Sequence, residues 1–322
     1  MNKIYISNST NPYHNLAIEE YLFSINRNDI ILYLWQNENT IVIGKHQNPY
    51  KECNLLAMSK DDVVLSRRTS GGGAVYHDLG NLNFTFILPT KEFNVQKQLQ
   101  VIIDTLKEFN INTIFTGRND ITLENGQKVS GNAFRQNSEM SIHHGTLLID
   151  VDMNKLTKYL TPSKTKFISK GFDSVKSRVA NLKQINQNIS DEILKRIIIE
   201  KFTDAYGEYE LLTDAYFDTN AIGNIENKNQ SFDWLFGNLP KYNAIITNRF
   251  SFGEMEFSFF LEKGIIKDIT IYSDAINEGM IDDIENILKN TRFTQKSIID
   301  KLGLLSHEEV DEIITYFEMN GI

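Results

Sequence analysis

The sequence predicts an α+β fold, in which a sheet with antiparallel pairs is accompanied by a few helices. Two observations favour this class over a doubly wound parallel sheet. Candidate strands outnumber candidate helices in the first 150 residues, and hairpin turns join some of them. A third observation, a hydrophobic content of 41% in 322 residues, provides enough apolar side chains for a substantial core.

The strand predictions rest on short runs rich in β-branched and aromatic residues. These runs lie at residues 30–36, 40–44, 63–66, 81–88, 121–124, 128–136 and 140–150. Asn125-Gly126 separates two of them and is the sequence signal of a type I′ turn. We therefore expect residues 121–124 and 128–136 to pair as an antiparallel hairpin.

Three helices are expected in the same part of the chain, at residues 15–24, 95–110 and 190–205. The last has the clearest start, because Ser190 is a good N-cap residue and the acids Asp191 and Glu192 favour the positive end of the helix.

The C-terminal part reads as a second, smaller unit. Residues 218–231 are polar and rich in Asn, which predicts an exposed connection, and a new unit begins after about residue 242. Apolar and polar side chains then alternate along a strand, with one break: Met255, Phe257, Phe259 and Leu261 are apolar, and Phe260 interrupts the alternation. A turn at 262–264 returns the chain along 265–272, and helices follow. We expect one domain at 1–243 and a small α+β domain at 247–322.

Composition excludes several classes of protein. The chain has 33 Lys+Arg and 42 Asp+Glu, so its net charge of −9 argues against a protein that binds nucleic acid over its whole surface. Its single cysteine, Cys53, excludes a disulfide framework and a cysteine-based zinc site, and fits a reducing compartment. No leader and no run of 18 apolar residues is present, so we expect a cytoplasmic protein without membrane contact.

The most conspicuous local feature is a glycine-rich loop, residues 67–77, with the sequence RRTSGGGAVYH. Successive glycine N–H groups form a concave surface that accepts anionic oxygens, and Arg67 and Arg68 add positive charge. The spacing matches neither common nucleotide-binding fingerprint. On the glycines alone, a flexible hairpin with two solvated arginines is an equally good interpretation.

A second cluster combines a GRND turn at 117–120 with the strand at 128–136. Strand alternation would place Lys128, Ser130 and Asn132 on one face and Arg135 on the other. A lone lysine at the start of a strand is usually only solvated, but here it begins a polar strand face in a chain that also carries a glycine loop.

Two further features carry charge or imidazole groups. His143 and His144 are neighbours on a strand and must face opposite sides, so they cannot bind one metal ion together. Gly145 allows a close approach of another main chain.

In the basic segment 164–178, Asp173 is the only acidic residue. The segment is either a solvated loop, or a loop that closes over a phosphate or docks an acidic partner.

Taken together and in this order, these motifs resemble the lipoate–protein ligase A family. The resemblance extends over nearly the whole chain, through NLAIEE (15–20), KECN (51–54), the glycine loop, GRND, KVSGNA (128–133), HHGTLL (143–148), SVKSRV (174–179), Phe236-Gly237 and Arg249-Phe250. It implies a large catalytic domain with a mixed or antiparallel sheet, of the type shared with biotin protein ligases, and a small C-terminal accessory domain.

The resemblance also implies an activity. Lipoate and ATP, with Mg²⁺, would give lipoyl-AMP, and the lipoyl group would pass to a lysine of a lipoyl domain of a 2-oxoacid dehydrogenase complex or of the glycine-cleavage H protein. A monomer would suffice. The preferred carrier, the choice between lipoate, octanoate and a lipoamide-derived donor, and the ligands of the metal stay open.

Residue roles follow from the motif match. Lys128 would be the catalytic residue, touching both the lipoate carboxyl and the α-phosphate. The nucleotide or adenylate would be held by Arg68, Gly73, Ala74, Val75, Tyr76, Asn119, Asp120, Lys176 and Arg178. The lipoyl part of the substrate would contact Ser70, Gly71, Gly72, His77, Ser130, Arg135, His144 and Gly145.

Three other functions are compatible with this kind of fold. An ATP-independent octanoyl or lipoyl transferase would need a cysteine nucleophile, and Cys53 is the only candidate. It reads better as a small buried residue than as a thiolate. A non-catalytic carrier-binding protein would have no use for Lys128, Arg68 and the glycine loop. A biotin ligase is a third possibility, against which the motifs favour lipoate.

Overall fold

The computed structural model describes residues 1–116, 119–160, 179–236 and 244–320. The chain divides into two compact units. The first contains Met1–Ile43, Pro49–Arg68 and Ala74–Leu235, and the second contains Gly44–Asn48, Thr69–Gly73 and Phe236–Ile322. Two short segments of the N-terminal half therefore belong to the same compact unit as the C-terminal residues.

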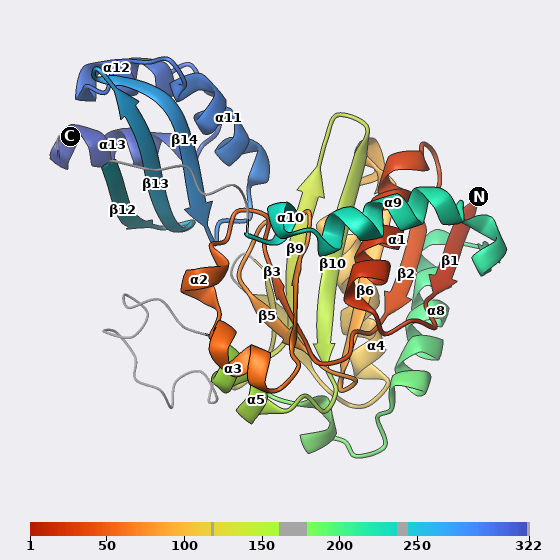
Figure 1. The fold of residues 1–322 in the computed structure, drawn as a ribbon. Helices are drawn as coiled ribbons and strands as arrows, with labels where there is room; N and C mark the ends of the chain where they lie inside the picture. The colour runs from red at the N-terminus through yellow and green to blue at the C-terminus, as the bar shows by residue number, and fades with distance from the viewer. Residues whose placement is uncertain (117–118, 161–178, 237–243, 321–322) are drawn as a thin grey trace. The chain divides into compact units, whose positions relative to one another are not determined.

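The first unit is built on an eight-stranded mixed sheet in the order β11-β1-β2-β6-β10-β9-β8-β7 (Figure 1). Its strands are β1 (Asn2–Ile6), β2 (Ile31–Trp35), β6 (Asn81–Pro89), β7 (Thr113–Thr116), β8 (Asp120–Leu123), β9 (Lys128–Gln136), β10 (Met140–Leu148) and β11 (Tyr209–Leu211). Only the β1–β2 and β1–β11 pairs are parallel. The antiparallel pairs confirm the α+β prediction.

Helices cover both faces of this sheet. On one face α4 (Val95–Lys107) and α8 (Asp191–Tyr206) pack over a core that includes Leu34, Phe84 and Phe86. On the other, α1 (Pro12–Ile25) and α9 (Thr219–Gln230) cover Tyr33, Trp35 and Ile142. We refer to these as the α4 face and the α1 face. The predicted N-cap of α8 is confirmed, because the Ser190 side chain accepts a hydrogen bond from the Ile193 N–H.

A small second sheet completes the first unit. It has the order β4-β3-β5, with β3 (Thr40–Ile43) in the centre, β4 (Val64–Arg67) parallel to it and β5 (Val75–His77) antiparallel. Among the described residues of this unit, the remaining helices are α2 (Pro49–Glu52), α3 (Leu55–Lys60), α5 (Met153–Tyr159) and α10 (Phe232–Phe236), with short 3₁₀ turns η1 (Thr90–Glu92), η2 (Leu182–Gln184) and η3 (Asp214–Tyr216). The glycine loop joins β4 to β5.

The second unit has a three-stranded antiparallel sheet, β12 (Ala244–Phe250), β13 (Gly253–Glu262) and β14 (Ile265–Ser273). Three helices enclose its core, α11 (Glu278–Leu288), α12 (Gln295–Leu302) and α13 (Val310–Asn320). The predicted alternation holds, with Met255, Phe257 and Phe259 buried. The predicted break is a register shift between Phe260 and Leu261.

Two predictions about turns and connections are wrong. Residues 218–231 are not an exposed connection: Asp218 caps α9, whose Ile222 and Asn229 are buried beside α1. Asn has a modest helix propensity, but a cap and one buried face outweigh it. The turn at Asn125-Gly126 is not type I′ either, because only Gly126 has a positive φ, +82°. That pattern is typical of a three-residue hairpin loop that ends in a glycine bulge.

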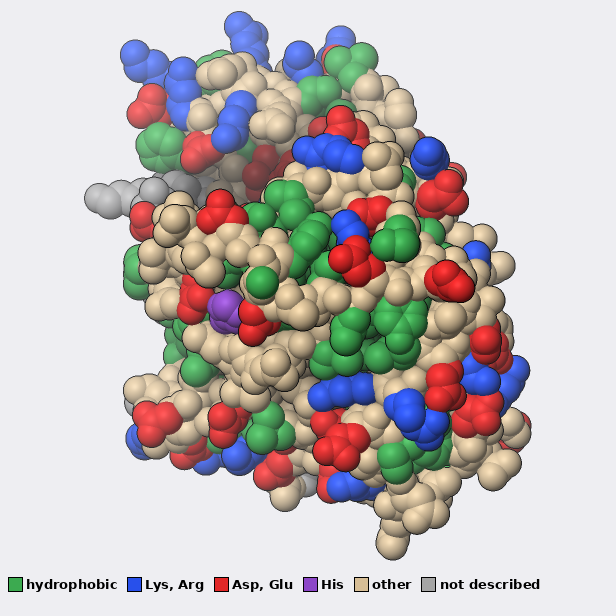
Figure 2. Space-filling model, turned by 90° about the vertical axis from the view of Figure 1, so that its right-hand side faces the viewer, with side chains coloured by type: hydrophobic (Ala, Val, Ile, Leu, Met, Phe, Trp, Pro, Cys, Tyr) green, Lys and Arg blue, Asp and Glu red, His purple; other side chains and the backbone are tan. Residues whose placement is uncertain are grey.

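Figure 2 shows the side of the molecule where β1 and α8 lie. Hydrophobic side chains form a band across this face, and Lys, Arg, Asp and Glu are interspersed around it. The edge strand β11 carries exposed Tyr209 and Leu211. Charges of both signs alternate over this surface, so it does not produce a field of a single sign. In the described part of the chain, no helix is both long and apolar enough to cross a bilayer.

Candidate active site

The predicted catalytic lysine is placed by an irregularity in the sheet. β8 and β9 pair through Ile121 with Ser130 and through Thr122 with Lys128, so Val129 is an extra residue in β9. Such a bulge reverses the direction of the side chains that precede it. Lys128 therefore points to the face opposite Ser130 and Asn132, and the prediction that these three share a face is wrong for Lys128.

The Lys128 side chain folds over Gly131 on the α1 face. A Cβ on Gly131 would lie 2.6 Å from the Lys128 Nζ and 3.8 Å from the Thr146 Oγ1. The Nζ lies 2.7 Å from the Asp120 Oδ1, and both side chains are partly exposed. This pair therefore combines a positive charge, a carboxylate and access from solvent, which suits binding of a charged substrate.

A buried polar network lies on the same face. The Glu19 carboxylate, on α1, lies 2.9 Å from the His144 Nδ1 and accepts a hydrogen bond from the Thr85 Oγ1. Thr85 in turn accepts from the indole N–H of Trp35. Burial tends to raise the pKa of Glu19, but His144, Thr85 and the charge of Arg135 outweigh it and lower that pKa. Glu19 therefore stays ionised beside His144.

Several buried polar atoms on this side have no hydrogen-bond partner among the described residues, and they include the His77 Nε2, the Asn83 Nδ2 and one terminal nitrogen of Arg135. His77 contacts the Trp35 ring, and Asn83 pairs with Trp35 across β2 and β6. Burial, with the charges of Arg68 and His144, lowers the pKa of His77 to about 3, so His77 is neutral. Buried polar groups are normally paired, so these atoms indicate a place for a polar ligand.

The two arginines before the glycine loop have different surroundings. Both are buried, so the alternative of two solvated arginines is wrong. The Arg67 guanidinium donates to the carbonyls of Trp234 and Leu235 at the end of α10, and Arg67 is therefore structural. Arg68 donates to the Val42 carbonyl and lies close enough to His77 to lower its pKa.

The loop residues themselves divide between the two units. Ala74, Val75, Tyr76 and His77 belong to the first unit, whereas Ser70, Gly71, Gly72 and Gly73 belong to the second. Val75 and Tyr76 pair with β3, and β5 is an edge strand, so part of its main chain faces away from the sheet. Gly72 has a φ of +89° and its N–H donates to the Ala275 carbonyl, so this N–H already has an acceptor.

Other predicted residues lie on the α4 face. Ser130 and Asn132 are buried there, and the Asn119 carbonyl accepts from the main chain and side chain of Asn132. Gly145 makes room for the Phe84 ring and the Asn132 side chain, since its Cβ would lie within 2.5 Å of both. The structure thus separates Ser130 and Gly145 from Lys128, His144 and Arg135.

The two histidines face opposite sides, as predicted. The His143 Nε2 lies 2.9 Å from Asn132 and its Nδ1 lies 2.8 Å from Gln98 of α4. Burial lowers the pKa of His143 to about 3, and a neutral imidazole donates from one nitrogen only. The atoms that face the ring are the Gln98 Oε1 and the Asn132 Oδ1, both acceptors, so a neutral His143 can donate to only one of them.

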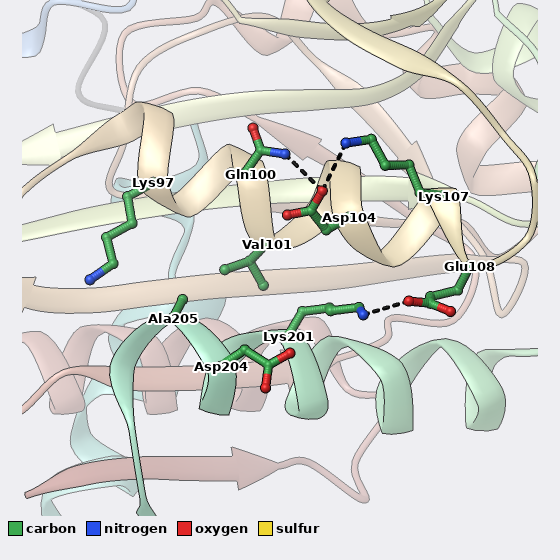
Figure 3. Close-up of a pocket in the computed structure, with 9 residues that line it drawn as sticks. All are labelled: Lys97, Gln100, Val101, Asp104, Lys107, Glu108, Lys201, Asp204 and Ala205. Carbon is green, nitrogen blue, oxygen red and sulfur yellow. Dashed lines mark hydrogen bonds and ion pairs between the residues drawn. The ribbon is translucent and has the colours of Figure 1, made fainter.

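The structure describes a hollow of about 390 Å³ elsewhere, on the α4 face between α4 and α8. It is lined by Lys97, Gln100, Val101, Asp104, Lys107, Glu108, Lys201, Asp204 and Ala205 (Figure 3). Asp104 accepts from Gln100 and Lys107, and Lys201 pairs with Glu108. Since most of its charges pair with one another, this hollow is a weaker candidate than the α1 face.

Sequence analysis missed Glu19, Trp35, Asn83 and Thr85. The signal that could have identified them is the presence of polar residues at inward-facing positions of otherwise apolar helices and strands. Asn81, Asn83 and Thr85 alternate with Leu82, Phe84 and Phe86, and Glu19 follows the buried Ala17 and Ile18.

Lys176 and Arg178, with the rest of the basic segment, lie outside the described residues. Among the described residues, no group of three or more His, Cys, Asp or Glu side chains could hold a metal ion.

Comparisons with known proteins identify the family to which this chain is similar. Residues 11–203 match the family model of the lipoyl protein ligase A/B catalytic domain, and residues 239–317 match that of the bacterial lipoate protein ligase C-terminus. A lipoate-protein ligase A of Blochmanniella floridana is 40% identical over 296 residues, covering 89% of this chain and 87% of that protein.

Solved structures give the same picture. The crystal structure of P. falciparum LipL1 in complex with lipoate superposes with a TM-score of 0.88 at 34% identity, covering 99% of this chain and all of that one. A lipoate-protein ligase A bound with ATP has a TM-score of 0.64 at 21% identity and covers 74% of this chain and 99% of that one. The latter similarity shows the fold alone.

Proposed function

The chain belongs to the lipoate–protein ligase A family, and we propose that it uses ATP to attach lipoate to a lysine of a carrier protein. The observation that carries this proposal is the position of Lys128. The bulge at Val129 brings its ammonium group to the α1 face, beside Asp120 and on the face that holds Glu19 and His144.

In the first step a lipoate carboxylate oxygen attacks the α-phosphorus of ATP. An O–P bond forms, the bond from that phosphorus to the bridging oxygen breaks, and pyrophosphate leaves with the electron pair. Two anions must approach each other, so the site has to supply positive charge where negative charge accumulates. We assign this role to Lys128, with Arg68, the outward main chain of β5 at Val75 and Tyr76, and the main chain of Gly73 and Ala74 holding the adenylate.

The lipoate carboxylate and chain would lie along the α1 face. Arg135 and His77 have unpartnered nitrogens there, as does Asn83. A carboxylate or other acceptor would satisfy the donors among them. Ser130, Asn132 and Gly145 would act indirectly, by fixing β9 and β10 from the α4 face. Ser70, Gly71, Gly72 and His144 complete the proposed lipoyl contacts.

On the nucleotide side we propose Asn119 and Asp120, with Lys176 and Arg178 of the basic segment. Mg²⁺ usually takes one or two carboxylates together with phosphate oxygens and water, so a three-residue cluster is not required. Asp120 fits this need, since its side chain is 37% exposed. When bound, Mg²⁺ would offset phosphate charge.

In the second step the acceptor lysine attacks the acyl carbonyl. A C–N bond forms, the bond from the carbonyl carbon to the phosphate oxygen breaks, and AMP leaves as the amine loses a proton. No covalent enzyme intermediate is needed. Cys53 agrees with this route, because it is 5% exposed and burial raises the pKa of its thiol to about 12. A thiol of this kind is a poor nucleophile, which disfavours the transferase alternative.

We propose residues 1–243 as the catalytic domain and 247–322 as the accessory domain, acting as a cytoplasmic monomer. The carriers would be lipoyl domains of 2-oxoacid dehydrogenase complexes, the glycine-cleavage H protein, or both. Carrier choice depends on surface complementarity between the two proteins.

The deciding experiment is the intact mass of a purified apo lipoyl domain after incubation with this protein, lipoate and Mg-ATP. A gain of one lipoyl group that disappears without ATP is the expected result. A gain from an acylated donor protein without ATP would instead indicate a transferase. Carrier binding without any mass gain would indicate a non-catalytic binding protein. Biotin supplied in competition with lipoate tests the biotin ligase possibility.

A further inference from the structure

The glycine loop and the C-terminal residues share a network of main-chain hydrogen bonds within the second unit. The Lys45 N–H donates to the Ser70 carbonyl at 2.9 Å, which joins segment 44–48 to the glycine loop. The Gly72 N–H donates to the Ala275 carbonyl at 3.0 Å, and the Ser273 N–H donates to the His46 carbonyl at 2.9 Å. Both segments are therefore fixed to the chain that leads from β14 to α11.

Gly71 shows how close this approach is. A Cβ at that position would lie 2.6 Å from the Ala275 carbonyl oxygen and 3.0 Å from that of Ile276. These are main-chain atoms, which cannot move aside as the end of a flexible side chain can. A glycine is required at residue 71 because of residues 275–276.

One ion pair supports the same arrangement. The Lys45 Nζ lies 2.6 Å from the Asp282 Oδ2 on α11, and the His46 Nε2 lies 3.8 Å from the Oδ1. The side chains of Lys45 and Asp282 are 30% and 45% exposed, so the pair contributes modestly but sets the position of segment 44–48. Because the Lys45 N–H donates to the Ser70 carbonyl, holding segment 44–48 in place also holds the glycine loop at residue 70.

We propose that Asp282 is a positioning residue for the substrate-binding loop, acting through Lys45 and Ser70. The second unit would then set the shape in which Ser70, Gly71, Gly72 and Gly73 meet the lipoyl-adenylate, in addition to any role in carrier binding. This rests on the proposed function, in which these loop residues contact the lipoyl-adenylate.

A charge exchange tests the proposal. The variants are Asp282→Lys, Lys45→Asp and the two combined. A matched control exists in the same unit, where the Lys289 Nζ lies 3.1 Å from the Asp268 Oδ1 with side chains 42% and 39% exposed. The control set is Asp268→Lys, Lys289→Asp and their combination. Two readouts are needed: lipoate KM and kcat for lipoyl-AMP formation, and amide hydrogen exchange of residues 69–73.

We expect each single Lys45 or Asp282 variant to raise the lipoate KM about fivefold, the upper range for a partly exposed pair, with kcat changed less than about twofold. Exchange of residues 69–73 should accelerate. The double variant should restore both quantities, and the control set should leave both unchanged.

Three results would overturn the proposal: single variants that match the wild type, a double variant that does not recover, or faster loop exchange without a change in KM. If the wild type makes no lipoyl-AMP, the proposed function fails. The exchange measurement then decides by itself whether Asp282 positions the loop.

Discussion

Lys128 and Ser130 are two residues apart in one strand, yet their side chains point to opposite faces of the sheet. The extra residue, Val129, causes this reversal. It places the Lys128 Nζ 2.7 Å from Asp120 and leaves Ser130 buried on the α4 face with Asn132. The position of the proposed catalytic charge is thus set by a strand irregularity, and several predictions depend on it.

Lys128→Ala should reduce lipoyl-AMP formation about 10²–10⁴-fold, as when one preorganised donor of positive charge is removed. Pyrophosphate release measures this step without a carrier. Lys183→Ala is the control, since Lys183 is a partly exposed lysine paired with Asp150. If Lys128→Ala kept more than about half of the wild-type rate, Lys128 would not be the residue that supplies positive charge in this step.

Gly131→Ala should displace the Lys128 ammonium without unfolding the protein. The added methyl group would meet only the flexible end of Lys128 closely, at 2.6 Å from the Nζ and 2.8 Å from the Cε. A displacement of this size should lower adenylation about 10- to 100-fold with little change in Tm. Gly223→Ala is the control, because a Cβ there meets no atom within 4 Å. Equal rates for the two variants would contradict the prediction.

Gly71→Ala and Gly73→Ala should differ. The first must shift the main chain at residues 275–276, whereas a Cβ on Gly73 meets no atom within 4 Å. We expect Gly71→Ala to raise the lipoate KM at least about tenfold, and Gly73→Ala to raise it clearly less. Steady-state kinetics with both variants checks this. The prediction fails if the order is reversed.

Cys53→Ser should leave ATP-dependent lipoylation in place, because the reaction needs no thiol nucleophile. The buried thiol, whose pKa burial raises to about 12, should also react slowly with thiol reagents in the folded protein. Lipoylation of a lipoyl domain by Cys53→Ser, with Cys53→Ala beside it, measures the first expectation. Loss of activity in both variants at unchanged Tm would favour the transferase.

His143 should make the stability of the first unit depend on pH. The pKa of His143 is lowered to about 3, below its unfolded value of 6.5, so the unfolded chain binds a proton that the folded chain does not. The contribution of His143 to the free energy of unfolding is therefore fully present above pH 6.5. It falls by about 1.4 kcal/mol per pH unit as the pH drops towards 3. His77 contributes in the same window and the same direction.

His143→Gln should remove one such contribution between pH 6.5 and 5. Urea unfolding followed by tryptophan fluorescence reports this unit, because Trp35 and Trp234 both lie in it. Glu19 does not change the stability between pH 6.5 and 5, because its pKa is lowered and its contribution is lost only below the ordinary value of 4.5. His307→Gln, in the second unit, is the control. An unchanged pH dependence in His143→Gln would show that folding does not shift the pKa of His143.

Local patterns in the sequence determined several structural features of this protein and its family. The alternation along β13, its break at Phe260, the Ser190 cap and the opposite directions of His143 and His144 each depend on a few neighbouring residues. The motifs at the glycine loop and at 128–133 likewise identified the family before any contact was known. Periodicity, capping and motif spacing are local properties, and a sequence displays them directly.

The tertiary structure alone decided the rest. The bulge at Val129 is a feature of the pairing between β9 and β8, and α9 buries Ile222 beside α1. The Glu19–His144 pair joins residues 125 positions apart, and Gly71 is required because of a carbonyl about 200 residues further along the chain. These features depend on contacts between distant segments, and such contacts leave no periodic signal in either segment.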